Sequence, residues 1–218
     1  LIKNEILNLK NVITYYDRNG ELRRVEKLYD KGNQLFILNN KISFLLNSIF
    51  DEEFIIFKDK FNLKPPNGEG FHAHYDGIFK WIDENNTPRN GWYEYSNFFV
   101  NVLVALDKCD HANGALQISD INDESFDNLL KKTYNDGSPN ILKEIESNLI
   151  FQTPILKPGD VIIFSNKCPH RSFKNKSHNS RMTLYYTYHP KKDGDNYEKY
   201  FTDKGISKNI NKSLTGDI

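Results

Sequence analysis

Cysteine is scarce in this chain, since Cys109 and Cys168 are the only two among 218 residues. Two cysteines do not make the disulfide framework of a small secreted domain. Cys168 stands two residues before His170, which allows it to be interpreted as a metal ligand. A small buried thiol in a reducing compartment is the simpler interpretation, because a soft thiolate suits zinc or copper better than oxygen-activating iron. We therefore expect a cytoplasmic protein.

Net charge and long apolar runs are missing as well. Lysine plus arginine and aspartate plus glutamate both number 29, so the formal net charge is zero and gives no footprint for a nucleic acid. No apolar run approaches the roughly 18 residues that span a bilayer, and no signal peptide is recognisable. The chain begins at Leu1 and not at a methionine, which leaves open whether native N-terminal residues are missing from it. We expect neither a nucleic acid nor a membrane as partner, and the oligomeric state stays open.

Aromatic residues are plentiful, at 13% of the chain, with fifteen Phe and twelve Tyr. The apolar runs between turns are mostly short, which favours a sheet-rich domain. The length suits one domain with a sizeable core over residues 1–218. We predict a mainly β fold with flanking helices (α+β), built on a jelly roll whose short strands line a central cavity.

One helix is predicted over residues 41–50, with Asn39 or Asn40 as its cap. Its apolar residues recur at helical spacing, namely Ile42, Leu45, Leu46 and Ile49. Residues 120–149 are polar and are predicted to form a partly helical insertion. A polar tail begins at about residue 191, and we expect order there only where three aromatic side chains pack: Tyr197, Tyr200 and Phe201.

Four strands are predicted, over residues 53–64, 98–106, 161–164 and 181–188. In the first, Phe57, Phe61 and Leu63 share one face, and the other face carries Lys58, Lys60, Asn62 and Lys64. We expect Lys58 and Lys60 to be solvated, and the 161–164 strand to be buried. The last strand has a polar face made of Arg181, Thr183, Tyr185 and Thr187. Such a face is expected to point inward only if the cavity holds a charged ligand, because an unpaired buried charge is costly.

Three possible metal ligands alternate in the stretch from Gly70 to Gly77, namely His72, His74 and Asp76, and on a strand all three point to one side. His170 follows far downstream. Two imidazoles and one carboxylate hold Fe(II) while leaving positions open for a co-substrate and O₂. We therefore prefer His74, Asp76 and His170 as ligands. His72 with His74 and His170 is the alternative, a set more typical of Zn²⁺ or of cupin metals.

Arg181 stands eleven residues after His170, where it could bind a dicarboxylate. Each residue also has an ordinary interpretation taken singly. His170 would then be a surface histidine, Arg181 a solvated edge-strand cation and Ser172 a loop hydroxyl. The combination favours the iron site.

The sequence resembles the phytanoyl-CoA dioxygenase family of Fe(II)/2-oxoglutarate oxygenases, over roughly residues 22–190. The most specific segments are His74-Tyr75-Asp76 and Pro169-His170-Arg171-Ser172, the latter leading to Asn175, Ser177 and Arg181. Further similarity lies in residues 23–26, 57–66, 113–117 and 157–160.

The resemblance implies a double-stranded β-helix with iron at His74, Asp76 and His170. It further implies that Arg181 binds the distal carboxylate of 2-oxoglutarate, with Ser172 as hydroxyl donor and Thr183 as a weaker helper. Lys64 and Asn62 would touch co-substrate or substrate. Halogenases of this type replace the carboxylate ligand with a small residue, so Asp76 favours hydroxylation or a related oxidation by O₂, with release of succinate and CO₂.

Two departures from the family pattern leave the substrate open. Tyr75 stands where many members carry glutamine, and Ile118-Ser119-Asp120 replaces a Pro-Gly-Ser-His turn. Residues 77–100 are predicted to form a lid over the iron. Four of them could contact substrate, as Tyr75 could, although loop packing explains them equally well: Lys80, Trp81, Arg89 and Trp92.

Candidate substrates are a small metabolite, an amino-acid-like or phosphonate compound, or a natural-product intermediate. Two other functions remain open. One is a cupin-like metal-dependent protein that is not an oxygenase, such as an isomerase or zinc enzyme. The other is a non-catalytic small-molecule binding protein.

Overall fold

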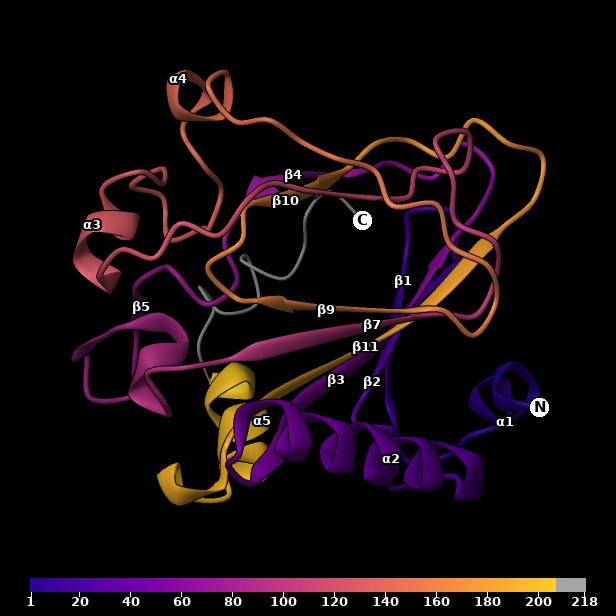
Figure 1. The fold of residues 1–218 in the computed structure, drawn as a ribbon, viewed down its shortest axis with the longest axis horizontal. Coiled ribbons are helices and arrows are strands. Elements are labelled where there is room, and N and C mark those ends of the chain that lie inside the picture. The colour runs from indigo at the N-terminus through magenta and orange to yellow at the C-terminus, as the bar shows by residue number, and fades with distance from the viewer. Residues whose placement is uncertain (207–218) are drawn as a thin grey trace.

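The protein folds as two antiparallel sheets that face each other, which confirms the predicted mainly β jelly roll (Figure 1). The computed structural model describes residues 1–206. The larger sheet has the order β1-β2-β3-β11-β7-β9. Its strands are Ile13–Tyr16 (β1), Leu22–Glu26 (β2), Phe54–Lys64 (β3), Arg181–Pro190 (β11), Val100–Ala105 (β7) and Val161–Ser165 (β9). The smaller sheet consists of Phe71–His74 (β4), His170–Ser172 (β10) and Leu116–Ile118 (β8).

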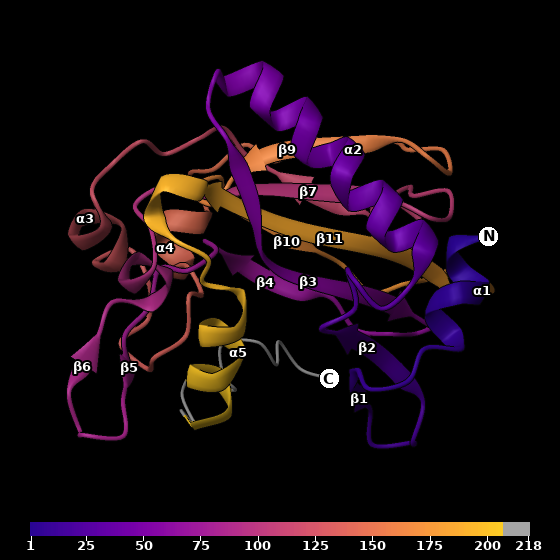
Figure 2. The ribbon, with the colours of Figure 1, turned by 90° about the horizontal axis from the view of Figure 1, so that it is seen from below.

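Helices cover the outside of this β core. Asn33–Phe50 (α2) lies across the face of the larger sheet that points away from the smaller one, with Ile2–Leu7 (α1) beside its start (Figure 2). Tyr197–Ile206 (α5) closes one end. The remaining short elements are Trp81–Ile82 (β5), Pro88–Arg89 (β6), Gly91–Glu94 (η1), Phe126–Leu130 (α3), Lys143–Glu146 (α4) and Lys191–Asp193 (η2). Within residues 1–206, no helix combines the length and apolarity needed to cross a bilayer.

Helix α2 is longer than its sequence predicts, because its cap comes from elsewhere in the chain. The carboxylate of Glu5 accepts hydrogen bonds of 3.1 Å from the backbone N–H groups of Gln34 and Leu35. The predicted start at residue 41, with Asn39 or Asn40 as cap, is therefore wrong. Four residues of the helix are buried, namely Leu35, Asn39, Ile42 and Leu46. The predicted apolar face is only half right, since Leu45 and Ile49 are exposed.

The central strands β3 and β11 divide apolar from polar side chains. Their outer face packs under α2, where the Tyr188 hydroxyl donates to Oδ1 of Asn39 over 2.8 Å. Their inner face points at the smaller sheet, so the expected solvation of Lys58 and Lys60 is wrong. Lys58 is only 4% exposed, and Lys60 lines a cavity between the sheets.

Strand β9 was predicted to be buried, but it forms an edge of the larger sheet, and its Val161 is 42% exposed. Periodicity cannot distinguish an apolar edge strand from a central one, because the difference depends on which strand pairs beside it.

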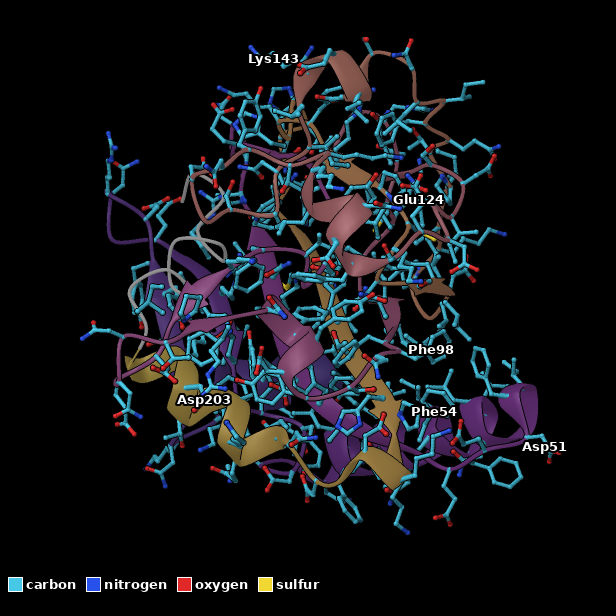
Figure 3. All side chains as sticks on the ribbon, turned by 90° about the vertical axis from the view of Figure 1, so that its left-hand side faces the viewer. Asp51, Phe54, Phe98, Glu124, Lys143 and Asp203 are labelled. Carbon is cyan, nitrogen blue, oxygen red and sulfur yellow. The ribbon has the colours of Figure 1, made fainter. Side chains whose placement is uncertain are left out.

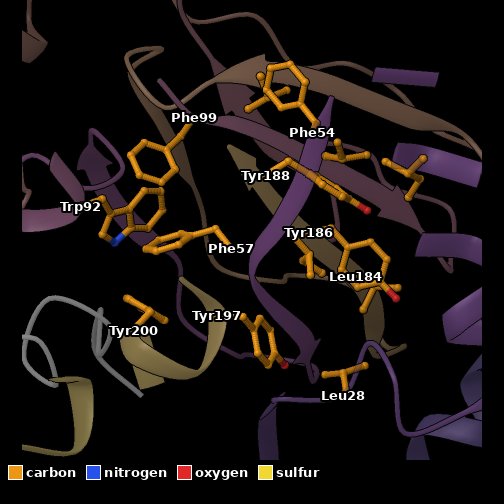
Figure 4. Packing of buried hydrophobic residues seen from close by; sticks show 14 of the residues in the cluster. Leu28, Phe54, Phe57, Trp92, Phe99, Leu184, Tyr186, Tyr188, Tyr197 and Tyr200 are labelled. Atoms are coloured by element: carbon orange, nitrogen blue, oxygen red, sulfur yellow. The ribbon is translucent and has the colours of Figure 1, made fainter. Parts of the chain in front are cut away.

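The main core is rich in aromatic rings (Figure 4). Phe57 packs against Trp92, Phe99 and Tyr200, with ring centroids between 4.7 and 5.5 Å apart. Tyr200 belongs to α5, and Tyr197 and Phe201 of the same helix are also buried. The predicted polar tail therefore contributes to the core, and its residues 207–218 lie outside the described part of the chain.

Residues 120–149, predicted to be a partly helical insertion, contain the short helices α3 and α4. They lie over the smaller sheet, at the opposite end of the molecule from the α2 C-cap Asp51 (Figure 3). Leu129 and Ile141 pack there with Tyr75 in a separate apolar cluster.

Candidate active site

Antiparallel pairing of β10 with β4 places His170 directly opposite His74, with ring centroids 4.1 Å apart. Asp76 lies two residues beyond β4. Its carboxylate is 3.6 Å from His170 Nε2 and 4.0 Å from His74 Nε2. One donor atom from each of the three residues lies within 4.8 Å of the others. His72 is exposed, and neither it nor Cys168 belongs to this group.

Both imidazoles are oriented with one nitrogen toward the group. Nδ1 of His74 lies 2.7 Å from the carbonyl oxygen of His72, and Nδ1 of His170 lies 3.0 Å from that of Cys168. A carbonyl only accepts, so each Nδ1 carries the hydrogen and each Nε2 presents a lone pair. Backbone carbonyls commonly orient metal-binding histidines in this way.

The three side chains are in the protonation states that bind a metal. Burial, together with the neighbouring His170, lowers the pKa of His74 to about 3, and burial lowers the pKa of His170. Burial alone would raise the pKa of Asp76, but His170, Lys60 and Lys58 hold it below its usual range. Two neutral imidazoles and one carboxylate fit Fe(II) with open coordination positions.

Arg181 lies at the start of β11, opposite Lys64 of β3. It is 4% exposed, and its Nε has no hydrogen-bond partner among residues 1–206. Its Nη1 is 3.5 Å from the Thr183 hydroxyl, and Thr183 is fully buried. A buried donor without an acceptor is costly. A carboxylate ligand would satisfy the guanidinium with two parallel hydrogen bonds.

Lys64 is held beside Arg181 by three oxygen atoms. Its Nζ donates to the Ser172 hydroxyl over 2.8 Å, and to the carbonyls of Phe173 and Gly114 over 2.8 and 3.2 Å. Gly114 has φ +67°, and a Cβ there would lie 2.2 Å from the Phe173 carbonyl oxygen, so the position requires glycine. Burial, with the nearby charge of Arg181, lowers the pKa of Lys64 to about 6.

A cavity between the sheets joins these groups. Six residues that the sequence singled out line it: Asn62, His74, Asp76, His170, Ser172 and Arg181. Six others line it without having been named as site residues: Arg24, Lys60, Phe71, Leu116, Arg171 and Tyr185. Tyr185 was already placed on the polar face expected to point inward, and Lys60 could have been found in the same way, because it lies on the polar face of β3. Arg24 had no such signal, since its strand was not recognised.

The five predicted substrate residues do not line this cavity. Tyr75 is fully buried in the cluster with Leu129 and Ile141. Lys80 is exposed, and Arg89 pairs with Asp83 at 2.8 Å. Trp81 and Trp92 are each 3% exposed and belong to the main core.

The sequence predicts a loop here, but it contains no signal for which side of that loop is buried. The segment 77–100 is therefore anchored in part, and its motion as a lid stays a prediction.

Comparison with known families gives one match, to the family described as phytanoyl-CoA dioxygenase (PhyH), over residues 37–183. The matched range contains the three candidate metal ligands and Arg181.

Two curated relatives act on phosphonates according to their names. The 2-aminoethylphosphonate dioxygenase of an uncultured bacterium is 26% identical over 84% of this chain. The methylphosphonate hydroxylase of Gimesia maris is 28% identical over 81% of the chain. This chain spans only 64% and 61% of the length of those proteins.

Solved structures share the fold. EctD from S. alaskensis with bound Fe superimposes with a TM-score of 0.64 at 16% identity, covering 88% of this chain and 66% of EctD. SnoK, described as a non-heme alpha ketoglutarate dependent carbocyclase, gives a TM-score of 0.61 at 14% identity, covering 85% of this chain and 71% of SnoK. At these identities the likeness concerns the fold alone.

Proposed function

The chain belongs to the phytanoyl-CoA dioxygenase family, and we propose that it is an Fe(II)- and 2-oxoglutarate-dependent dioxygenase that hydroxylates a small molecule. One observation carries the proposal: His74, Asp76 and His170 present donor atoms within 4.8 Å of one another in the cavity that Arg181 also lines. EctD, which has the same fold, has been solved with Fe and with 2-oxoglutarate and 5-hydroxyectoine.

The residues present fit both groups. Nε2 of His74, Nε2 of His170 and one oxygen of Asp76 would hold the iron, leaving half of an octahedron open. Bound together, iron and 2-oxoglutarate supply the oxidising chemistry, in which O₂ is consumed, the substrate gains a hydroxyl group, and succinate and CO₂ are released.

Each protein group then has a defined task. Arg181 pairs with the distal carboxylate of 2-oxoglutarate and so fixes the direction of the co-substrate. The Ser172 hydroxyl, which accepts from Lys64, keeps its own hydrogen as a further donor, and Thr183 supports the guanidinium. His170 and Arg181 are 5% and 4% exposed, so their burial limits the water around the reacting groups.

The names of the relatives make a small phosphonate the first substrate class to test. Because the chain covers less than two thirds of either relative, this substrate class is a proposal about the whole protein and is tested separately from the chemistry.

The first test is anaerobic addition of Fe(II) and 2-oxoglutarate. We expect the visible charge-transfer absorbance of an Fe(II)–oxoglutarate complex, followed by succinate when O₂ is admitted. His74→Ala, Asp76→Ala and His170→Ala should each abolish both signals. His72→Ala is the matched control on the same strand and should keep them.

A zinc enzyme using His72, His74 and His170 would give neither signal in the wild type, and its zinc binding would be lost in His72→Ala and kept in Asp76→Ala. A non-catalytic binding protein would give no succinate at all. Either outcome would overturn the proposal.

A further inference from the structure

Two lysines on the inner face of β3 make no direct hydrogen bond or ion pair among residues 1–206. Lys58 is 4% exposed, and its Nζ lies over the ring of Trp92, 4.1 Å from the centroid. Lys60 lines the cavity, and its Nζ lies 4.8 Å from the ring centroid of Tyr185. Aromatic faces attract a cation, but they carry no net charge that would neutralise an ammonium group.

The nearby carboxylates are already engaged. Glu26 is buried between Lys204, which donates to it, and Arg24, whose Nη1 is 3.7 Å away. Asp76 faces two histidines and accepts a hydrogen bond from Asn101. Burial, with repulsion from Lys60, lowers the pKa of Lys58, and burial lowers that of Lys60. Asp76 and Glu26 attract both lysines without contacting them, whereas Lys204 repels both and Arg24 repels Lys60. Four cationic side chains therefore face two carboxylates, and the cost of burying this excess positive charge falls when an anion binds.

Lys60 lines the cavity, and Lys58 lies two residues along the strand, behind the lining. Both lie away from the end of the cavity that holds Arg181. Arg181 is opposite Lys64 in the β3–β11 register, whereas Tyr185 is opposite Lys60 and Thr187 is opposite Lys58. Four residues of strand separate Lys60 from Lys64, which is roughly 13 Å. One 2-oxoglutarate carboxylate bound at Arg181 therefore leaves the lysine pair free.

The pair is close to the metal ligands. Asn101, which donates to Asp76, pairs with Thr187 and so lies level with Lys58. An anionic group held by the lysines would keep the neighbouring carbon of a small substrate near the candidate iron position. Two ammonium groups match a doubly charged oxyanion better than a singly charged carboxylate.

The surroundings hold Lys58 in place. Trp92 and Tyr200, whose ring centroids are 4.1 and 5.6 Å from Lys58 Nζ, are 3% and 1% exposed. Both pack on Phe57 in the main core (Figure 4). Binding an anion there would require little reordering of the lysine.

Resting on the proposed function, we infer that Lys58 and Lys60 bind the phosphonate group of the primary substrate. They are the residues that select for a small organic phosphonate, while Arg181 selects for the co-substrate.

The test uses protein loaded with Fe(II) and 2-oxoglutarate without O₂, titrated with methylphosphonate by calorimetry and by the change in visible absorbance. Lys58→Met and Lys60→Met should each raise the Kd of methylphosphonate at least tenfold and leave the affinity for 2-oxoglutarate unchanged. Lys60→Arg should keep most of the binding. Lys41→Met, at an exposed lysine of α2, is the control and should behave as the wild type.

A second readout does not need turnover. Without methylphosphonate, Lys58→Met should melt at a higher temperature than the wild type, because it removes an unpaired buried charge. Added methylphosphonate should raise the melting temperature of the wild type and not that of Lys58→Met. A lower melting temperature of ligand-free Lys58→Met would contradict the inference.

Three other outcomes overturn the inference and are distinguishable. If the Fe(II)–oxoglutarate absorbance never forms, the proposed function fails and the inference falls with it. If it forms but methylphosphonate does not bind, or acetate binds as tightly, only the phosphonate assignment fails. If the variants weaken the binding of 2-oxoglutarate as much as the binding of methylphosphonate, the lysines belong to the co-substrate site.

Discussion

Asn101 of β7 donates a hydrogen bond from Nδ2 to Oδ2 of Asp76 over 2.8 Å. Its own Oδ1 accepts a hydrogen bond of 2.8 Å from the Thr187 hydroxyl on β11. Asn101 is 2% exposed, so its amide is fixed by these two contacts. The larger sheet thereby orients a carboxylate that belongs to a loop after the smaller sheet.

Asn101→Ala should therefore weaken Fe(II) binding by about 10- to 100-fold, the usual effect of losing a hydrogen bond that orients a metal ligand. The measurement is an anaerobic Fe(II) titration. Thr187→Val, which removes only the group that orients the amide, should have a smaller effect. Unchanged Fe(II) affinity in Asn101→Ala would show that Asp76 does not depend on this contact.

Arg181→Met should raise the Kd of 2-oxoglutarate by about 30-fold or more, because truncating one partner of a buried charged pair costs about 2 kcal/mol or more. Arg181→Lys should recover only part of the affinity, since an ammonium cannot form the two parallel hydrogen bonds. Calorimetry with Fe(II)-loaded protein measures both. Equal affinity in Arg181→Lys and wild type would exclude a bidentate pair.

Lys64 should make stability depend on pH. Its pKa is lowered to about 6 in the folded protein, whereas a lysine in an unfolded chain titrates near about 10.4. Between those values the unfolded chain binds more protons at this site, so stability rises with pH. From about pH 6.5 to pH 8.5, within this window, the free energy of unfolding should rise more steeply in the wild type than in Lys64→Met. Urea unfolding at both pH values gives the two slopes. Equal slopes would mean that the three oxygen acceptors keep Nζ charged.

Glu5→Ala should destabilise the protein by about 1 kcal/mol, the usual cost of losing a helix cap, since two N–H groups of the first turn of α2 lose their acceptor. Glu5→Gln should lose less, because its amide oxygen still accepts. Urea unfolding measures the difference, with Glu84→Ala at an exposed loop position as control. If Glu84→Ala lowers the free energy of unfolding as much as Glu5→Ala does, the capping explanation is wrong.

The long strands that carry the site could be predicted from the sequence, because alternation of polar and apolar residues depends only on neighbouring positions. Alternation over residues 53–64 and 181–188 predicts the strands observed as β3 and β11, and it places Asn62 on the polar face of the first and Arg181 and Thr183 on the polar face of the second. The preference for His74 over His72 came from the chemistry of the donor set, whereas the position of Lys60 on the cavity wall depends on which strands pair. No local pattern contains that information.

The sequence alone determined which functional groups are available, namely two imidazoles, a carboxylate and an arginine. They belong to segments in which apolar and polar residues alternate, as they do in strands. Only the tertiary structure decided that β10 pairs with β4, that Glu5 caps α2, and that Lys58 faces inward. The reason is physical. Alternation depends on neighbouring residues, whereas pairing, capping and burial depend on groups that lie tens of residues apart in the chain.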